Sequence, residues 1–186
     1  MIRNGSASLQ AIETARLNVR PFQPDDWQAV FDYMSSPVVT TWLPEGSLTA
    51  EETRAFVAEN TIDEPKALAV WLKRGHGPIG HMLFHPWFAH RTYEIGWVFA
   101  EPYQGQGYAT EAARALLTHG FETLGLHRVI ATCQPENIAS WRVMEKLGMR
   151  REGHFRRCIY RGEDRWWDEY FYALLADEWQ PAAASA

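Results

Sequence analysis

The chain has 186 residues, a length that suits one domain with a sizeable hydrophobic core. Its hydrophobic content of 46% is ordinary for a globular protein. The formal net charge of −5 argues against nucleic acid as the main partner, because a phosphate-binding surface needs an excess of basic residues. The acidic balance fits a cationic or amine substrate instead.

The cysteine content and the hydropathy pattern bear on the compartment. Cys133 and Cys158 fall in separate predicted elements without metal-binding spacing, which favours a reducing environment over a disulfide framework. No apolar run reaches the roughly 18 residues needed to span a bilayer. The first residues also lack the apolar core of a signal peptide. We therefore expect a cytoplasmic protein with no membrane partner.

The first part of the chain predicts one strand and two helices. Residues 17–20 alternate apolar and polar side chains, as a strand does. A helix begins near Pro24 with acidic residues in its first turn, and it stops at Pro37. A second helix begins after Thr49, because Thr49 and Glu52 have the spacing of a capping box.

The second part predicts most of a sheet. Three strands joined by short connections suggest an antiparallel meander, at 66–73, 79–84 and 93–99. After a helix, the pattern continues with a buried strand, a helix that ends at a glycine, and two last strands, at 128–133, 137–147, 149–160 and 166–175. The result is a mixed sheet with about four helices, an α/β or α+β layered domain. We predict a single domain over 1–186, with an ordered core of about 12–180 and loose tails at 1–11 and 181–186.

The stretch from 93 to 121 combines a strand, a glycine-rich turn and a helix. Alternation gives the strand one large apolar face (Tyr93, Ile95, Trp97 and Phe99) and one face with smaller or acidic side chains (Glu94, Gly96 and Val98). Pro102 ends the strand because it cannot donate to a sheet ladder. Gly105 and Gly107 then let backbone N–H groups and a helix N-terminus approach a phosphate.

Two common phosphate-binding motifs do not fit this turn. A dinucleotide-binding fingerprint needs a third glycine where this chain has Thr110. A Walker A loop needs a lysine, and the turn contains none. A nucleotide-binding domain therefore loses support, and a plain glycine turn between strand and helix is the structural alternative.

The turn resembles motif A of the GNAT superfamily of acyl-CoA-dependent N-acyltransferases. That motif is Gln/Arg-x-x-Gly-x-Gly/Ala, and residues 104–109 are Gln-Gly-Gln-Gly-Tyr-Ala. In the family these backbone amides hold the pyrophosphate of coenzyme A. The resemblance implies a mixed, mostly antiparallel sheet of about seven strands with about four helices, and acetyl-CoA as donor without a metal. It predicts cofactor binding by Val98, Phe99, Ala100, Gln104, Gly105, Gln106, Gly107, Tyr108, Ala109 and Thr110.

A second motif follows the strand at 128–133. Asn137 is placed to cap a short helix, and Ser140 lies one turn inside it on about the same face. Together with the first motif, Asn137-x-x-Ser140 followed by Glu-Lys-Leu-Gly at 145–148 resembles GNAT motif B. In the family this asparagine contacts the pantetheine arm or orders the site around it. The resemblance therefore adds Asn137 and Ser140 to the predicted cofactor site, with simple helix capping as the alternative.

The resemblance is closest to the Rim-type ribosomal-protein N-terminal acetyltransferases. Those begin with Thr-x-Arg-Leu-x-Leu-Arg-Pro, and this chain has Thr-Ala-Arg-Leu-Asn-Val-Arg-Pro at 14–21. They end with an Asp-rich aromatic strand and a Glu-Trp, which stand here at 167–170 and 178–179. The resemblance implies acetyl transfer to a primary amine, with the N-terminal α-amino group of a protein favoured. A small-molecule amine (polyamine, amino acid or aminoglycoside) and a non-catalytic acyl-CoA-binding module are the alternatives.

The expected chemistry assigns two catalytic residues. An alkylamine is mostly protonated at pH 7 and must lose its proton before it attacks a thioester. Glu94 is the predicted base, because Gly96 and Val98 on the same face leave room for a pantetheine arm, and a glutamate often occupies this position in Rim-like enzymes. Many GNAT enzymes place a tyrosine acid where this chain has Trp141, which has no O–H, so Ser140 is the predicted donor to the thiolate. An ion-paired glutamate and a packing serine are the alternatives.

Other side chains are further candidates. His81 and His85 share a strand face, but no carboxylate or cysteine spacing supports a metal site with them and His90, and we predict no metal. A base or substrate-contact role for His81 or His85 is left open. Cys133 has no evident histidine partner, which favours direct transfer over an acyl-cysteine route. Tryptophans could line the acceptor pocket or pack in the core (Trp42, Trp87 and Trp97), and the aromatic C-terminal hairpin could serve a homodimer.

Overall fold

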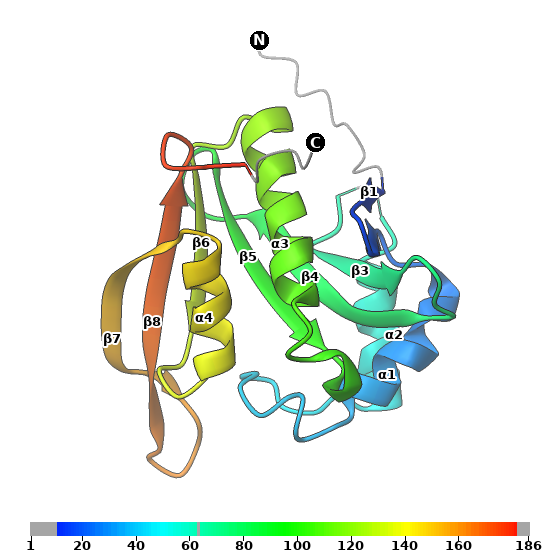
Figure 1. Ribbon diagram of the computed structural model, residues 1–186. Coiled ribbons are helices and arrows are strands. Elements are labelled where there is room, and N and C mark those ends of the chain that lie inside the picture. The colour runs from blue at the N-terminus through cyan, green and yellow to red at the C-terminus, as the bar shows by residue number, and fades with distance from the viewer. Residues whose placement is uncertain (1–10, 63, 182–186) are drawn as a thin grey trace.

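The computed structural model describes residues 11–62 and 64–181 (Figure 1). They form one sheet of eight strands in the order β1-β2-β3-β4-β5-β6-β8-β7. All neighbouring strands are antiparallel except β5 and β6, which are parallel. The strands are β1 (Ile12–Glu13), β2 (Leu17–Arg20), β3 (Ala67–Leu72), β4 (Pro78–Pro86), β5 (Thr92–Phe99), β6 (Arg128–Cys133), β7 (Arg150–Tyr160) and β8 (Trp166–Leu175).

Helices cover both faces of the sheet (Figure 1). The described residues form four α-helices: α1 (Trp27–Met34), α2 (Ala50–Glu59), α3 (Tyr108–Thr118) and α4 (Ile138–Lys146). The helices α3 and α4 bury their apolar residues in one core, and α1 and α2 bury theirs in a second core on the opposite face. The arrangement confirms the predicted mixed sheet with helices on its faces. None of these helices is long and apolar enough to cross a membrane.

Local sequence signals account for most element boundaries. The capping box at α2 is present, since Thr49 Oγ1 accepts from the Glu52 N–H at 3.2 Å and Glu52 Oε2 accepts from the Thr49 N–H at 2.8 Å. The alternation in β5 is also confirmed. Ile95 and Phe99 belong to the core beneath α3 and α4, whereas Val98 belongs to the core beneath α1 and α2.

Short elements differ from the prediction. The eighth strand, β1, has two residues, too few for a period-2 pattern to reveal it. A 3₁₀ turn at Pro24–Asp26 precedes α1, and a π-helical turn at His119–Thr123 extends α3. The predicted tails fall almost wholly on residues outside those described.

The two halves of the sheet are joined over a short distance only. The β5–β6 ladder consists of Thr92↔Arg128, Tyr93↔Val129 and Glu94↔Ile130. Beyond Glu94, β5 continues to pair with β4 up to Phe99, and β6 pairs with β8 up to Cys133. Figure 1 shows the two strands diverging toward the end where α3 begins. One edge of each strand therefore loses its ladder partner there, and a gap opens in the middle of the sheet.

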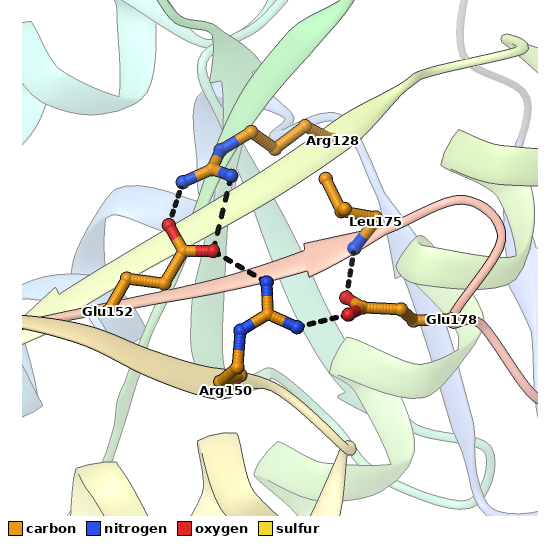
Figure 2. A network of polar contacts seen from close by, with 5 residues as sticks. All are labelled: Arg128, Arg150, Glu152, Leu175 and Glu178. Atoms are coloured by element: carbon orange, nitrogen blue, oxygen red, sulfur yellow. Dashed lines mark hydrogen bonds and ion pairs between the residues drawn. The ribbon is translucent and has the colours of Figure 1, made fainter.

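An ion-pair network ties the C-terminal strands together (Figure 2). Arg128 on β6 pairs with Glu152 on β7, and because β8 lies between these strands the pair passes across β8. Arg150 bonds to Glu152 at 2.8 Å and also pairs with Glu178, which accepts from the Leu175 N–H at 3.1 Å. These groups are partly exposed, so each ion pair alone contributes little to the free energy of unfolding. Together they fix the edge strand β7 and the end of β8.

One histidine is fully enclosed in the core beneath α1 and α2. The His81 side chain on β4 is 3% exposed, and its Nδ1 lies 2.8 Å from the Tyr33 hydroxyl of α1. Burial lowers the pKa of His81 to about 4, because the charged imidazolium loses its hydration. The enclosure of His81 in this core argues against a role as base or substrate contact.

The buried imidazole makes stability depend on pH. Its pKa is depressed in the folded state, so the unfolded chain binds the proton more readily. The contribution of His81 to the free energy of unfolding is therefore fully present above its ordinary pKa of 6.5. It is lost as the pH falls toward about 4. Unfolding free energies from urea titration should include an acid loss of about 3 kcal/mol from this residue. His81→Gln should flatten the profile between pH 6.5 and 4, and His76→Gln, at an exposed site, should not. Parallel profiles for wild type and His81→Gln would contradict this.

Candidate active site

A groove of about 360 Å³ opens where β5 and β6 separate. The walls of the groove come from the loop after α1, the C-terminal end of β5, the turn leading into α3, and one face of α4. The lining residues are Val38, Val39, Trp42 and Leu43 of the loop, 97–99 of β5, 103–110 without Gln106, and Asn137, Ala139, Ser140, Arg142, Val143 and Lys146. The two predicted sequence motifs thus lie on facing walls of a single groove.

The glycine turn exposes backbone N–H groups to this groove. Gly105 and Gly107 have φ of +71° and +82°, a left-handed conformation that other residues rarely adopt. Among the described residues, no acceptor takes the N–H groups from Gly105 to Thr110, whereas the Glu111 N–H bonds back to Gly107. Free amides at the start of an eleven-residue helix form an electropositive site that suits a phosphate.

The connection between β1 and β2 holds this turn in place by hydrogen bonds to Glu111 of α3. The Glu111 carboxylate accepts from Thr14 Oγ1 at 2.6 Å, from the Arg16 N–H at 2.9 Å and from Arg16 Nε at 2.6 Å. Burial raises the pKa of Glu111, but these hydrogen bonds outweigh it and the net shift is downward. Arg16 also donates to the Gln106 carbonyl at 3.1 Å and lies over the Tyr108 ring. Sequence reasoning used Thr14 and Arg16 only as a family resemblance and missed this bracing role.

The opposite wall is one face of α4 together with its cap residue Asn137. Asn137 Oδ1 accepts from the Ser140 N–H at 3.2 Å, so Asn137 does cap the helix, and both residues also line the groove. Trp141 donates through Nε1 to the Pro135 carbonyl at 3.1 Å, which is a structural contact. Arg142 and Lys146 bring positive charge to the same wall. Sequence reasoning missed these two cations, although their spacing of four residues places them on one helix face.

Glu94 stands at the vertex of the gap. It is the last residue of β5 that pairs with β6, and on its other side it faces His85 of β4. It does not line the groove itself. Burial raises the pKa of Glu94, the charge of nearby Glu169 raises it further, and His85 opposes the shift. The carboxyl group thus combines partial burial with a position beside the gap, which are the properties of a general base.

Cys133 lies near Ser140 but has the wrong electrostatics for a nucleophile. Its side chain is 5% exposed, and burial raises the pKa of the thiol to about 11, an effect that the Ser140 hydroxyl opposes only in part. A thiol with such a pKa remains protonated at neutral pH and is a poor nucleophile. The burial and the raised pKa of this thiol therefore argue against an acyl-cysteine intermediate.

Other predicted residues take varied positions. The Gln104 side chain lies at the groove but donates to the Phe99 carbonyl at 2.8 Å, and Gln106 donates to the Pro102 carbonyl at 2.6 Å. Ala100 lines a different cavity of about 660 Å³ between α1, the β3–β4 turn and the segment 100–103. This larger cavity contains neither the glycine turn nor α4. Two of the candidate tryptophans line the groove, Trp42 and Trp97, and Trp87 packs instead on its neighbours Phe88 and Phe171.

Comparison with known proteins decides the family. The family described as "Acetyltransferase (GNAT) domain" matches residues 16–150. The chain belongs to this family. It is an N-acetyltransferase, and the GNAT family uses acetyl-CoA as its acetyl donor. The predicted family, fold and reaction class are therefore confirmed.

Individual relatives add detail. The uncharacterized N-acetyltransferase YnaD of Bacillus subtilis is 52% identical over 168 residues, covering 90% of this chain and 98% of that protein. A crystal structure of a GNAT-family acetyltransferase from Bacillus anthracis matches with a TM-score of 0.86 and 50% identity, over 90% of this chain and 99% of that chain. The [ribosomal protein uS5]-alanine N-acetyltransferase of Escherichia coli is 28% identical over 87 residues, 47% of this chain and 44% of that protein.

The free amides of the glycine turn lead to a test. Gly105→Ala should weaken acetyl-CoA binding at least about tenfold, because Gly105 lines the groove and the added Cβ would take up space that the donor needs. No protein atom lies within 4 Å of that Cβ, so it would not clash with the protein itself. Gly148→Ala, after α4, is the matched control, since Gly148 also has positive φ and open space. Both variants should lose about 1 kcal/mol of stability. Calorimetric titration that finds equal affinity in the two variants would contradict a role for the turn in donor binding.

Proposed function

We propose that this enzyme transfers the acetyl group of acetyl-CoA directly to the N-terminal α-amino group of a protein, within the gap between β5 and β6. The observation that carries the proposal is the parting of the two strands at Glu94, beside a turn of free backbone amides. A donor lying in this gap would present its thioester between a carboxylate and the α4 wall. The amine would approach from the side of Glu94.

The proposed donor site uses the whole groove. The pyrophosphate lies on the N–H groups of Gly105 to Thr110, where the α3 dipole also favours negative charge. Arg142 and Lys146 lie on the facing wall and add attraction for the phosphates. The pantetheine arm follows the unpaired edge of β5 past Val98, whose neighbouring peptide groups have no partner on β6. Such an arm can replace the missing strand with hydrogen bonds of its own.

The proposed reaction is a direct displacement. Glu94 accepts a proton from the ammonium group, and the free amine then attacks the thioester carbonyl carbon. A backbone N–H on the free edge of β5 stabilises the oxyanion of the tetrahedral intermediate. The new C–N bond forms, the C–S bond breaks, and the coenzyme A thiolate accepts a hydrogen bond from Ser140. The proton that the nitrogen loses on becoming an amide passes to this thiolate and yields the free thiol. The raised pKa of Glu94 suits this role, since a base with a pKa nearer the working pH transfers protons more effectively.

The choice of acceptor rests on the resemblance to the Rim-type enzymes and on similarity to a protein named for alanine acetylation of ribosomal protein uS5. That match covers less than half of each chain, and the uncharacterized B. subtilis relative carries no acceptor in its name. The space beyond Glu94 also supports an amine, because Glu94 and Glu169 place two carboxylates there. Among the described residues, neither carboxylate takes part in an ion pair. The cytoplasmic location predicted from the sequence stays a prediction.

The role of Glu94 is tested by its conservative replacement. Glu94→Gln should lower kcat by about a hundredfold, because the amine loses its proton acceptor. Acetyl-CoA affinity should change less than twofold. In wild type, kcat/KM should rise with pH through the raised pKa of Glu94, and this limb should vanish in the variant. Glu122→Gln, exposed after α3, is the control. Unchanged kcat in Glu94→Gln would exclude this residue as the base.

The acceptor is tested with a competition between amines. Peptides with a free N-terminus, their N-terminally blocked counterparts that retain a lysine, a polyamine and an aminoglycoside are each incubated with the enzyme and acetyl-CoA. The proposal predicts release of coenzyme A with the free peptides and mass-spectrometric placement of the acetyl group on the α-nitrogen. Acetylation of only the small amines would contradict the protein acceptor and leave the N-acetyltransferase reaction intact.

A further inference from the structure

The loop after α1 crosses from one half of the sheet to the other. One guanidinium nitrogen of Arg161, in the β7–β8 turn, donates to the Leu43 carbonyl at 3.0 Å and to the Pro44 carbonyl at 2.9 Å. The same guanidinium lies 3.9 Å from the centre of the Trp167 ring on β8. Trp167 in turn packs on Trp42 of the loop, with ring centroids 5.6 Å apart. We call these contacts the Arg161 clasp.

The clasp spans the place where the sheet itself is open. Beyond Glu94, no residue of β6 pairs with β5, so strand pairing does not set the distance between the two halves. The loop belongs to the half that contains β5, because its base is tied to α1 by the Leu48 N–H to Met34 carbonyl bond at 3.0 Å. The turn with Arg161 belongs to the other half. The clasp therefore connects the halves across the open end of the gap.

The loop that the clasp holds is also a wall of the groove. Val38, Val39, Trp42 and Leu43 line the groove, and the bonded carbonyl of Leu43 belongs to one of these wall residues. Nearer the base of the loop, Thr40 is held within the loop by bonds to the Ser36 carbonyl at 2.9 Å and the Ser47 hydroxyl at 2.8 Å. The tip also has internal bonds, from the Leu43 N–H to the Thr40 carbonyl at 2.9 Å and from the Gly46 N–H to the Leu43 carbonyl at 3.1 Å, but these do not join it to β8. The contacts with Arg161 and Trp167 are what joins the loop to the C-terminal hairpin.

We propose that Arg161 is a positioning residue that fixes the 38–43 wall against the C-terminal hairpin and so sets the width of the gap at its open end. This inference rests on the proposed function, in which the gap holds the donor. Arg161 does not touch the reacting atoms. It acts through Trp42 and Leu43 of the loop wall and contacts neither the glycine turn nor α4, so it governs acceptor binding and water exclusion more than donor binding.

The chemistry of the clasp calls for arginine. The planar guanidinium can lie flat on the Trp167 ring while its N–H groups reach carbonyls that lie in the plane of the guanidinium. Lysine offers a compact point charge that can reach a carbonyl but cannot stack in this way. The backbone N–H of Arg161 bonds to the Arg165 carbonyl at 2.8 Å, so the turn itself survives a change of side chain. Substitution therefore removes the clasp and leaves the hairpin.

The experiment compares Arg161→Ala and Arg161→Lys with Arg165→Ala. Arg165 lies in the same turn and carries the same charge, but its side chain is exposed and, within residues 11–62 and 64–181, pairs only with Glu163 at 3.5 Å. Hydrogen exchange is measured over residues 38–48 in the acetyl-CoA complex of each protein. Steady-state kinetics give KM for donor and acceptor, and coenzyme A release without an amine reports hydrolysis of the thioester by water.

The proposal predicts faster exchange over 38–48 in Arg161→Ala, with about a tenfold rise in acceptor KM and donor KM within twofold of wild type. Hydrolysis without an amine should rise several-fold. Arg161→Lys should fall between wild type and Arg161→Ala, and Arg165→Ala should match wild type. Equal exchange and kinetics in Arg161→Ala and Arg165→Ala would overturn the proposal. So would donor and acceptor KM rising together, which would indicate a general structural role.

The design separates failure of the clasp from failure of the proposed function. If wild type binds acetyl-CoA but acetylates no peptide, the proposed acceptor is wrong, and exchange and hydrolysis still decide the clasp. If wild type does not bind acetyl-CoA, the groove is not the donor site and the inference falls with it. If Arg161→Ala fails to fold, Arg161→Lys decides by the same readouts.

Discussion

The parting of β5 and β6 after Glu94 is the constraint on which the rest of the structure depends. A buried sheet normally pairs both edges of every inner strand, because unpaired peptide groups away from water are costly. Here the ladder stops after three residue pairs, while both strands continue with their outer partners. The free edges must then be satisfied by something outside the sheet. A linear donor with amide groups of its own can fill that place.

In the proposed site, the surroundings of the gap complement an anionic donor and a cationic acceptor on opposite sides. Backbone amides of the Gly105–Thr110 segment, with Arg142 and Lys146, supply positive potential at one end. Glu94 and Glu169 supply negative charge at the other. Hydrogen bonds hold the elements that carry these groups. Glu111 holds the glycine turn through Thr14 and Arg16, and the Arg161 clasp holds the loop wall. Under this proposal, charge and position separate the two substrates before any chemistry occurs.

Features that depend on residues close together in the sequence could be predicted correctly. The two glycines, the capping box at Thr49 and the strand alternation around Ile95 each lie within a few residues, and the structure confirms all of these features. The family itself was recognised from short motifs because the chemistry of a phosphate turn restricts the backbone at adjacent positions. Fold class and reaction class could therefore be predicted from the sequence.

Contacts between distant residues were not predictable in this way. The bond from Thr14 to Glu111 joins residues 97 apart, and those from Arg161 to the loop join residues 117 and 118 apart. No period in the sequence links such pairs, since only the packed sheet brings them together. The burial of His81 was equally hidden, because alternation placed it on the same strand face as His85 but could not tell which end of that face is covered by α1.

The central claim is that the gap between β5 and β6 holds the donor, and a crystal structure with acetyl-CoA tests it most directly. The account predicts that the pantetheine arm lies along the free edge of β5 beside Val98 and Ser140. It also predicts the pyrophosphate on the amides of Gly105 to Thr110. Acetyl-CoA bound in the larger cavity between α1 and the β3–β4 turn, with the gap empty, would contradict the account.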